Sequence, residues 1–145
     1  GEQIDNKFKN LKWQTAYFNE SYNEKEFILK MKNLVQEIGM DNFLYITDYQ
    51  IFNVILNKRD FSPVKYWHYN TSFPSKSHPA RKKFEIFFKS KLKDNNIRFL
   101  ISDNTALNYQ EISEFSWILS CTISRNNFVF GGRDIFILEF SPNCF

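Results

Sequence analysis

The feature that most constrains the fold is an alternation of helix-periodic segments with short, almost wholly apolar runs. Between residues 27 and 38, apolar residues recur every three or four positions, at Phe27, Ile28, Met31, Leu34, Val35 and Ile38. This spacing predicts a helix that begins at an Asn23 cap and closes at Gly39. Residues 43–47 and 97–101 are instead nearly continuous in apolar side chains, which is typical of strands covered on both faces. Helices alternating with such strands indicate an α/β protein.

The segments between and after these two strands continue the alternation. The pattern predicts a helix over 49–57, a strand over 64–69, a helix over 79–94 and a short helix over 108–115. The apolar side of the helix over 79–94 is expected to consist of Ala80, Phe84, Phe87, Phe88 and Leu92. Asn108 and Glu111 have the spacing of a capping pair for the short helix.

The last part of the chain changes character, because strand-forming residues dominate it. Residues 117–123, 128–130 and 135–140 predict hairpin-like antiparallel strands, with Gly131-Gly132 in the last turn. The element order, wound by right-handed crossovers, predicts a three-layer Rossmann-like sandwich. Its sheet is expected to be open and mostly parallel, with an antiparallel C-terminal edge. Residues 1–22 are interpreted as an extended lead-in and residues 23–145 as a single α/β domain.

Candidate ligand-binding residues follow from the predicted strands, because ligands of open α/β sheets bind beyond the strands' carboxyl ends. These positions are Asp48, Asp103 and the stretch that contains His68 and Asn70. A carboxylate at such an edge can bind a metal or activate water, although Asp48 and Asp103 serve equally well as caps, which is the favoured interpretation. Trp67 and its aromatic neighbours can stack on a sugar or a base, but strand alternation places half of these rings in the core. No catalytic residue is assigned.

No motif indicates a cofactor, a metal or nucleic acid. No G-x-G-x-x-G follows a predicted strand, no G-x-S-x-G occurs, and His68 and His78 are too far apart for a His-x-x-x-His metal site. The net charge of +3 lies below the basic balance of a dedicated nucleic-acid-binding protein. No apolar run approaches the ~20 residues of a membrane helix.

Two further features leave alternatives open. Cys121 and Cys144 fit neither a zinc knuckle nor a redox pair, and two unpaired thiols are the commoner condition, with a disulfide as the alternative if the two segments meet. The helix over 79–94 also concentrates positive charge, at Arg81, Lys82, Lys83, Lys89, Lys91 and Lys93. Such a set can contact phosphates or anionic headgroups, but Glu85 and Asp94 interrupt it, so we interpret it as a solvated face.

From Asn42 to Phe140, the order and type of segments resemble the soluble C-terminal domains of multi-spanning, GT-C-like membrane glycosyltransferases. The similar segments are the loop Leu56-Asn-Lys-Arg-Asp-Phe-Ser-Pro63, the aromatic strand 64–69, the helix 81–94, the strand 96–103 and the closing strand 134–140. The resemblance implies an extracytoplasmic domain of a membrane-anchored parent that uses a polyprenyl-phosphate sugar. Its catalytic residues would lie elsewhere in the parent, and an oxidising compartment would favour pairing of Cys121 with Cys144.

Three functions follow as hypotheses. The first is a non-catalytic accessory domain that positions an acceptor or a partner, whose partners would be the membrane-embedded part of the same protein and a glycan or lipid-linked sugar. The second is a free-standing ligand-binding domain or small hydrolase that uses Asp48, His68 and Asp103. The third is a protein interaction module with an exposed aromatic patch.

Overall fold

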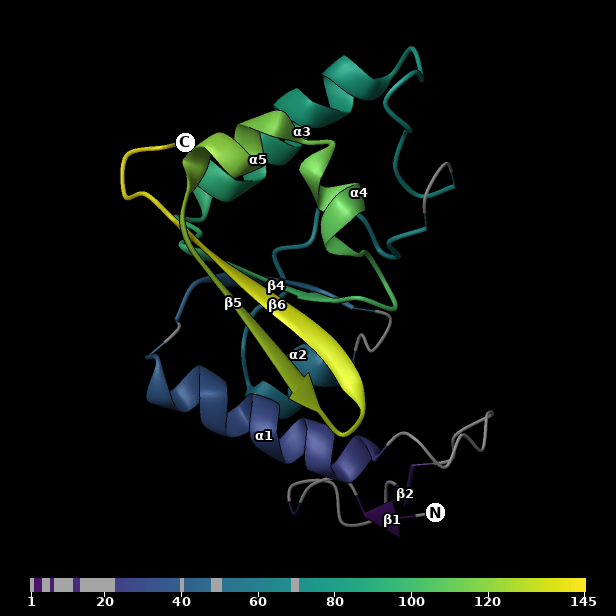
Figure 1. Cartoon of the computed structure of the whole chain (residues 1–145), viewed down its shortest axis with the longest axis vertical. Helices are drawn as coiled ribbons and strands as arrows, with labels where there is room; N and C mark the ends of the chain where they lie inside the picture. Colours follow the sequence, from purple (N-terminus) through teal and green to yellow (C-terminus); the bar gives the residue numbers. More distant parts are fainter. Residues whose placement is uncertain are drawn as a thin grey trace.

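The computed structural model describes residues 2–3, 6, 12–13, 23–39, 41–47, 51–68 and 71–145. In chain order the elements are β1 (Glu2–Gln3), β2 (Lys12–Trp13), α1 (Glu24–Glu37), β3 (Phe43–Ile46), α2 (Ile51–Leu56), α3 (Arg81–Asp94), β4 (Phe99–Asp103), α4 (Tyr109–Ser113), α5 (Ser116–Cys121), β5 (Thr122–Phe130) and β6 (Arg133–Phe140) (Figure 1). β1 and β2 pair antiparallel, apart from the main sheet. Most of the predicted lead-in over 1–22 lies outside the described residues.

The main sheet has the strand order β3-β4-β6-β5. β3 runs parallel to β4, whereas β6 is antiparallel to both β4 and β5. The α/β class and the antiparallel C-terminal edge are therefore confirmed, but the expectation of a mostly parallel sheet is wrong for these strands. The reason is that the two-residue turn at Gly131-Gly132 forces β5 and β6 into a hairpin, and β6 then inserts beside β4 without a crossover helix.

Helices cover both faces of this sheet (Figure 1). On one face, Leu100 and Leu138 belong to a buried cluster with residues of α3, α4 and α5. On the other face, Ile101 and Ile137 belong to a second cluster with residues of α1 and α2. Neighbouring residues of β4 and β6 thus point into different clusters, as expected for strands covered on both sides.

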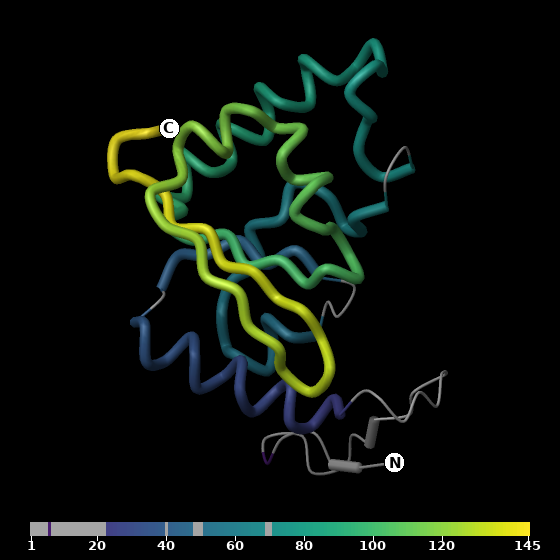
Figure 2. The backbone as a smooth tube through the Cα atoms, in the orientation of Figure 1, coloured from purple at the N-terminus to yellow at the C-terminus, as the bar shows by residue number. Residues whose placement is uncertain are grey.

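α1 begins and ends as the sequence predicts. The Asn23 side chain accepts a hydrogen bond from the Glu26 backbone N–H at 3.0 Å, and Gly39 adopts the left-handed conformation, with φ of +62°, just beyond the helix. The start of α1 also contacts the tip of the β5–β6 hairpin, because the Asn23 N–H donates to the Gly131 carbonyl at 2.9 Å (Figure 2). A Cβ atom at Gly131 would clash with the Asn23 carbonyl oxygen, so this contact requires glycine.

Residues 64–68 form no strand, contrary to the prediction for 64–69. Local hydrogen bonds replace a sheet ladder here: the Ser62 hydroxyl donates to the Val64 carbonyl at 2.6 Å and accepts from the Trp67 indole N–H at 3.0 Å. The aromatic residues of this segment suggested a strand, but one of them is instead a core residue of a loop. Trp67 is buried, and its ring lies 5.4 Å from Phe73 and 5.5 Å from Phe88, centroid to centroid.

The strand predicted over 117–123 is wrong in its first half, where the chain forms α5. Trp117, Ile118 and Cys121 are buried on one side of this short helix, a spacing that suits a helix face. The strand begins only at Thr122 and then continues through Asn126 and Asn127 without a turn. Apolar runs of this length do not distinguish a buried strand from a buried helix.

The apolar side of α3 also differs from its prediction. Phe88 and Leu92 are buried and Phe84 is partly buried, as expected, but Ala80 and Phe87 are exposed. Phe87 precedes Phe88 by about 100° around the helix axis, which turns it out of the buried stripe. None of the described helices combines the length and apolar content needed to cross a membrane.

Candidate functional site

The carboxyl end of β4 is the part of the predicted site that the structure describes most fully. Asp48 and Asn70 lie outside the described residues, so their candidacy stays a prediction. Asp103 ends β4 and is completely buried. Its Oδ2 accepts a hydrogen bond from Arg133 Nη1 at 2.9 Å, and its Oδ1 accepts from the Thr105 hydroxyl at 2.9 Å. The carboxylate therefore joins β4 to the first residue of β6 and presents no surface to a ligand.

Trp67 and His68 do not form a joint aromatic patch. The Trp67 ring is buried in the core cluster, whereas His68 is exposed and stacks on Tyr66 with 6.1 Å between ring centroids. The two neighbouring side chains thus lie in different environments. Trp67 has a structural position, and His68 remains accessible at the surface.

The structure joins Cys121 and Cys144 in a disulfide, with 5.5 Å between their Cα atoms. Cys121 ends α5, so the bond fixes the chain after β6 to that helix. The Phe145 ring packs edge-on against Trp117 and Phe140, at centroid distances of 5.7 and 5.0 Å. Figure 2 shows the chain end folded back beside α5.

One residue beyond Asp103, a surface hollow of about 280 Å³ lies between the loop after β4 and the β5–β6 hairpin. We call it the β4–β5 hollow. Its lining includes Asn104, Tyr109, Arg125, Asn127, Asp134 and Phe136. The hollow lies next to the strand end that the sequence suggested, but Asp103 is not in its lining, and the sequence analysis did not single out Tyr109 or Arg125. The polar run at residues 124–127 within an otherwise apolar strand was the available signal.

Stacking organises the β4–β5 hollow. The guanidinium carbon of Arg125 lies 3.5 Å from the centroid of the Tyr109 ring, and its Nε donates to Asn127 Oδ1 at 3.2 Å. Tyr109 in turn packs edge-on against Phe136, with 5.6 Å between centroids. Among the described residues, neither Nη nitrogen of Arg125 has a hydrogen-bond acceptor. The hollow thus contains the guanidinium of Arg125, which is stacked on Tyr109 and still has free N–H donors. It also contains amide and carboxylate groups.

A second hollow, of about 450 Å³, lies between α1 and α2. Lys58 and Asp41 line it and form an ion pair with 2.8 Å between Nζ and Oδ1. The hydrogen bond from Lys58 and its positive charge lower the pKa of Asp41 below its ordinary value. Lys58 and Asp41 neutralise each other, and Lys32 is the third charged residue of the lining. Because Asp41 already has a cationic partner, this hollow is the weaker candidate for a ligand site.

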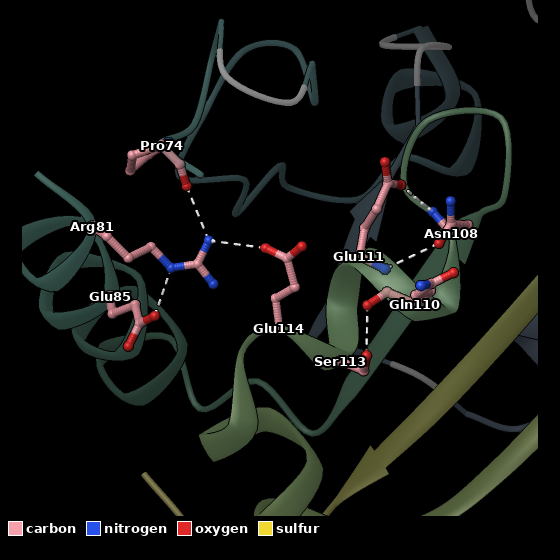
Figure 3. Close-up of polar contacts among 8 residues, drawn as sticks. All are labelled: Pro74, Arg81, Glu85, Asn108, Gln110, Glu111, Ser113 and Glu114. Carbon is pink, nitrogen blue, oxygen red and sulfur yellow. Dashed lines mark hydrogen bonds and ion pairs between the residues drawn. The ribbon is translucent and has the colours of Figure 1, made fainter. Parts of the chain in front are cut away.

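Arg81 at the start of α3 is the centre of a third polar cluster (Figure 3). Its Nε donates to Glu85 at 2.6 Å, its Nη1 donates to the Pro74 carbonyl at 2.9 Å, and Glu114 lies 3.8 Å away. The guanidinium also covers the Phe115 ring at 3.7 Å. Beside it, Asn108 and Glu111 complete the predicted capping box of α4. This cluster ties the segment before α3 to the turn between α4 and α5, a structural role.

Within the part of the chain that the structure describes, no three His, Cys, Asp or Glu side chains gather in a way that could hold a metal ion. Comparison of the chain with models of protein families, with characterised proteins and with solved structures found no match.

Proposed function

We propose that this chain is a non-catalytic, extracytoplasmic domain of a membrane-bound, glycosyltransferase-like protein, and that it positions a glycan acceptor in the β4–β5 hollow. We also propose the three-layer Rossmann-like sandwich as its finer fold class, supported by the helices on both faces of the sheet. The observation that carries the functional proposal is the Arg125–Tyr109 stack, which joins β5 to α4 in the lining of the hollow.

The chemistry of the β4–β5 hollow suits a sugar. Sugar hydroxyls both donate and accept hydrogen bonds, and the hollow offers amides at Asn104 and Asn127, a carboxylate at Asp134 and free donors on Arg125. Small-ligand sites commonly combine apolar walls with a few convergent polar groups, and Tyr109 and Phe136 supply such walls. The fully paired Asp103 beneath it supplies rigidity rather than chemistry.

The disulfide supports the proposed location. Disulfides persist mainly in oxidising compartments, and Cys121 and Cys144 are the only cysteines of the chain. The proposal that the parent is a membrane glycosyltransferase rests on the resemblance of segment order. A free-standing ligand-binding domain would use the same hollow, and the length and hydropathy of the complete coding sequence distinguish these two settings.

Backbone NMR titration with a panel of neutral and acidic mono- and disaccharides tests the site. We expect saturable shifts of the amides at Asn104, Tyr109, Arg125 and Asn127, and we expect Arg125→Ala to abolish them. Arg59→Ala is the matched control, because Arg59 also lies over an aromatic ring, that of Phe61 at 5.5 Å, outside the hollow. Shifts that map elsewhere, or that survive Arg125→Ala, would refute the assignment.

A further inference from the structure

The outward face of α3 carries large apolar side chains among lysines. Ile86 and Phe87 are 61% and 45% exposed. Five lysines of the same helix are exposed: Lys82, Lys83, Lys89, Lys91 and Lys93. The sequence alone suggested an ordinary solvated face opposite an apolar stripe, but in the structure this face has apolar residues of its own.

The lysines and the apolar side chains share one arc of the helix. At about 100° per residue, Lys82 and Lys93 lie within ~40° of Ile86, and Lys83 lies ~40° from Phe87. We call these five residues the α3 face. Among the described residues, no carboxylate forms an ion pair with any of its lysines.

Acidic groups balance this charge only in part. Glu85 turns toward Arg81, to which it is ion-paired at 2.6 Å. Asp94 is exposed and lies on the same arc, ~20° from Phe87, and it accepts a hydrogen bond from the Ser90 hydroxyl at 2.8 Å, so the face has three lysines against one carboxylate. The face therefore attracts anions. Its two apolar side chains leave water only when they contact an apolar partner.

We propose that the α3 face docks the protein on the surface of an anionic lipid bilayer. Ile86 and Phe87 enter the boundary between headgroups and acyl chains, while Lys82, Lys83 and Lys93 contact lipid phosphates. A helix that lies in a membrane interface has this composition, with aromatic or aliphatic side chains inserted and lysines around them. Nucleic acid would satisfy the lysines but would leave Ile86 and Phe87 without a partner. The inference stands on α3 alone and does not depend on the glycan site.

Co-sedimentation of the full chain with vesicles tests the proposal. We expect binding to phosphatidylcholine vesicles that contain phosphatidylglycerol, weak binding to pure phosphatidylcholine vesicles, and loss of binding as salt rises. The I86S/F87S double variant should bind anionic vesicles about tenfold more weakly. The K82Q/K93Q variant should bind about 30-fold more weakly, at roughly one decade per 1.4 kcal/mol.

Two matched variants serve as controls. I123S/V129S removes apolar side chains that are 60% and 63% exposed on β5, and K25Q/K30Q removes two exposed charges from α1. Both should bind vesicles like the unmodified chain. Since every substituted residue is exposed, circular dichroism should be unchanged in all variants.

Three results would overturn the proposal. The first is the absence of vesicle binding by the unmodified chain at low salt, and the second is an equal loss of binding in the control variants. The third is binding to a single-stranded DNA oligonucleotide that exceeds vesicle binding and survives I86S/F87S, because it would show that charge alone is recognised.

Discussion

Asp103 and Arg133 show how a residue that looks functional in the sequence becomes structural in the fold. Both side chains are buried, and each charge is stabilised by the other. Removing one partner breaks a buried ion pair, which costs more than replacing both charged side chains by apolar ones. The position at a strand end was therefore correctly identified, but strand ends are also where neighbouring strands are joined.

Asp103→Ala should lower the free energy of unfolding by about 3–5 kcal/mol, because it breaks a buried ion pair and two hydrogen bonds of the buried carboxylate. Urea denaturation followed by circular dichroism measures the change. The exposed Asp94→Ala substitution is the control and should stay within about 0.5 kcal/mol of the unmodified protein. The double variant D103L/R133M should recover most of the loss, and an equally unstable double variant would contradict the ion-pair explanation.

The Lys58–Asp41 pair gives a prediction for pH. The pKa of Asp41 is lowered in the folded protein, so the pair contributes stability above the unfolded carboxyl pKa of about 3.9 and loses it as pH falls through the lower folded pKa. In an NMR titration, Lys58→Gln should raise the midpoint of the Asp41 carboxyl carbon. High salt should also raise this midpoint, because it screens the attraction between the two charges of this exposed pair. An unchanged midpoint in the variant would refute the assignment to Lys58.

Among the elements, α3 places a core residue and an exposed residue next to each other in the sequence. Phe88 is completely buried and lies 5.3 to 5.9 Å, centroid to centroid, from the rings of Phe84, Phe115, Trp67 and Trp117. Phe87 is exposed and belongs to the α3 face. One side of the helix thus packs in the core, and the other side is exposed.

Phe88→Ala should therefore cost about 3–5 kcal/mol of unfolding free energy, because it removes a ring from the centre of a packed aromatic cluster. Phe87→Ala should change stability by no more than about 0.5 kcal/mol. Thermal and urea unfolding of the two variants, side by side, measure the contrast. Equal losses would mean that Phe87 also packs within the protein.

Elements with strong local signals could be predicted from the sequence, and those defined by their neighbours could not. The caps at Asn23 and Asn108 were visible because a cap and its partner are three residues apart. Residues 64–68 and 117–121 were misassigned because aromatic and apolar residues suit any buried segment. The Arg125–Tyr109 contact was likewise invisible, since it depends on β5 crossing next to α4.

At the scale of the whole molecule, strand order decides which parts are stable. β4 and β6 are central, and each contributes to the clusters on both faces of the sheet. β5 is an edge strand of nine residues. Local periodicity identified most of the buried strands, but it carries no information on strand order or direction, which explains the incorrect expectation of a mostly parallel sheet.

The rate of backbone hydrogen exchange should depend on whether a strand is central or at the edge of the sheet. Backbone amides that join β4 to β6 should exchange slowest, by global unfolding, whereas the amides of β5 that point away from β6 should exchange fastest within the sheet. Exchange monitored by NMR in deuterated buffer measures both sets. Protection of the outward β5 amides equal to that of β4 would show that another chain covers this edge.

The central place of β6 has a consequence for biosynthesis. A ribosome releases the chain from its N-terminal end, so β3 and β4 emerge before the strand that pairs with β4. Until residues 133–140 leave the exit tunnel, β4 has an open side, and the apolar clusters on both faces lack residues from β6. The sheet is thus completed only once β6 has been translated, and the nascent protein passes through a stage in which chaperones have an exposed strand to protect.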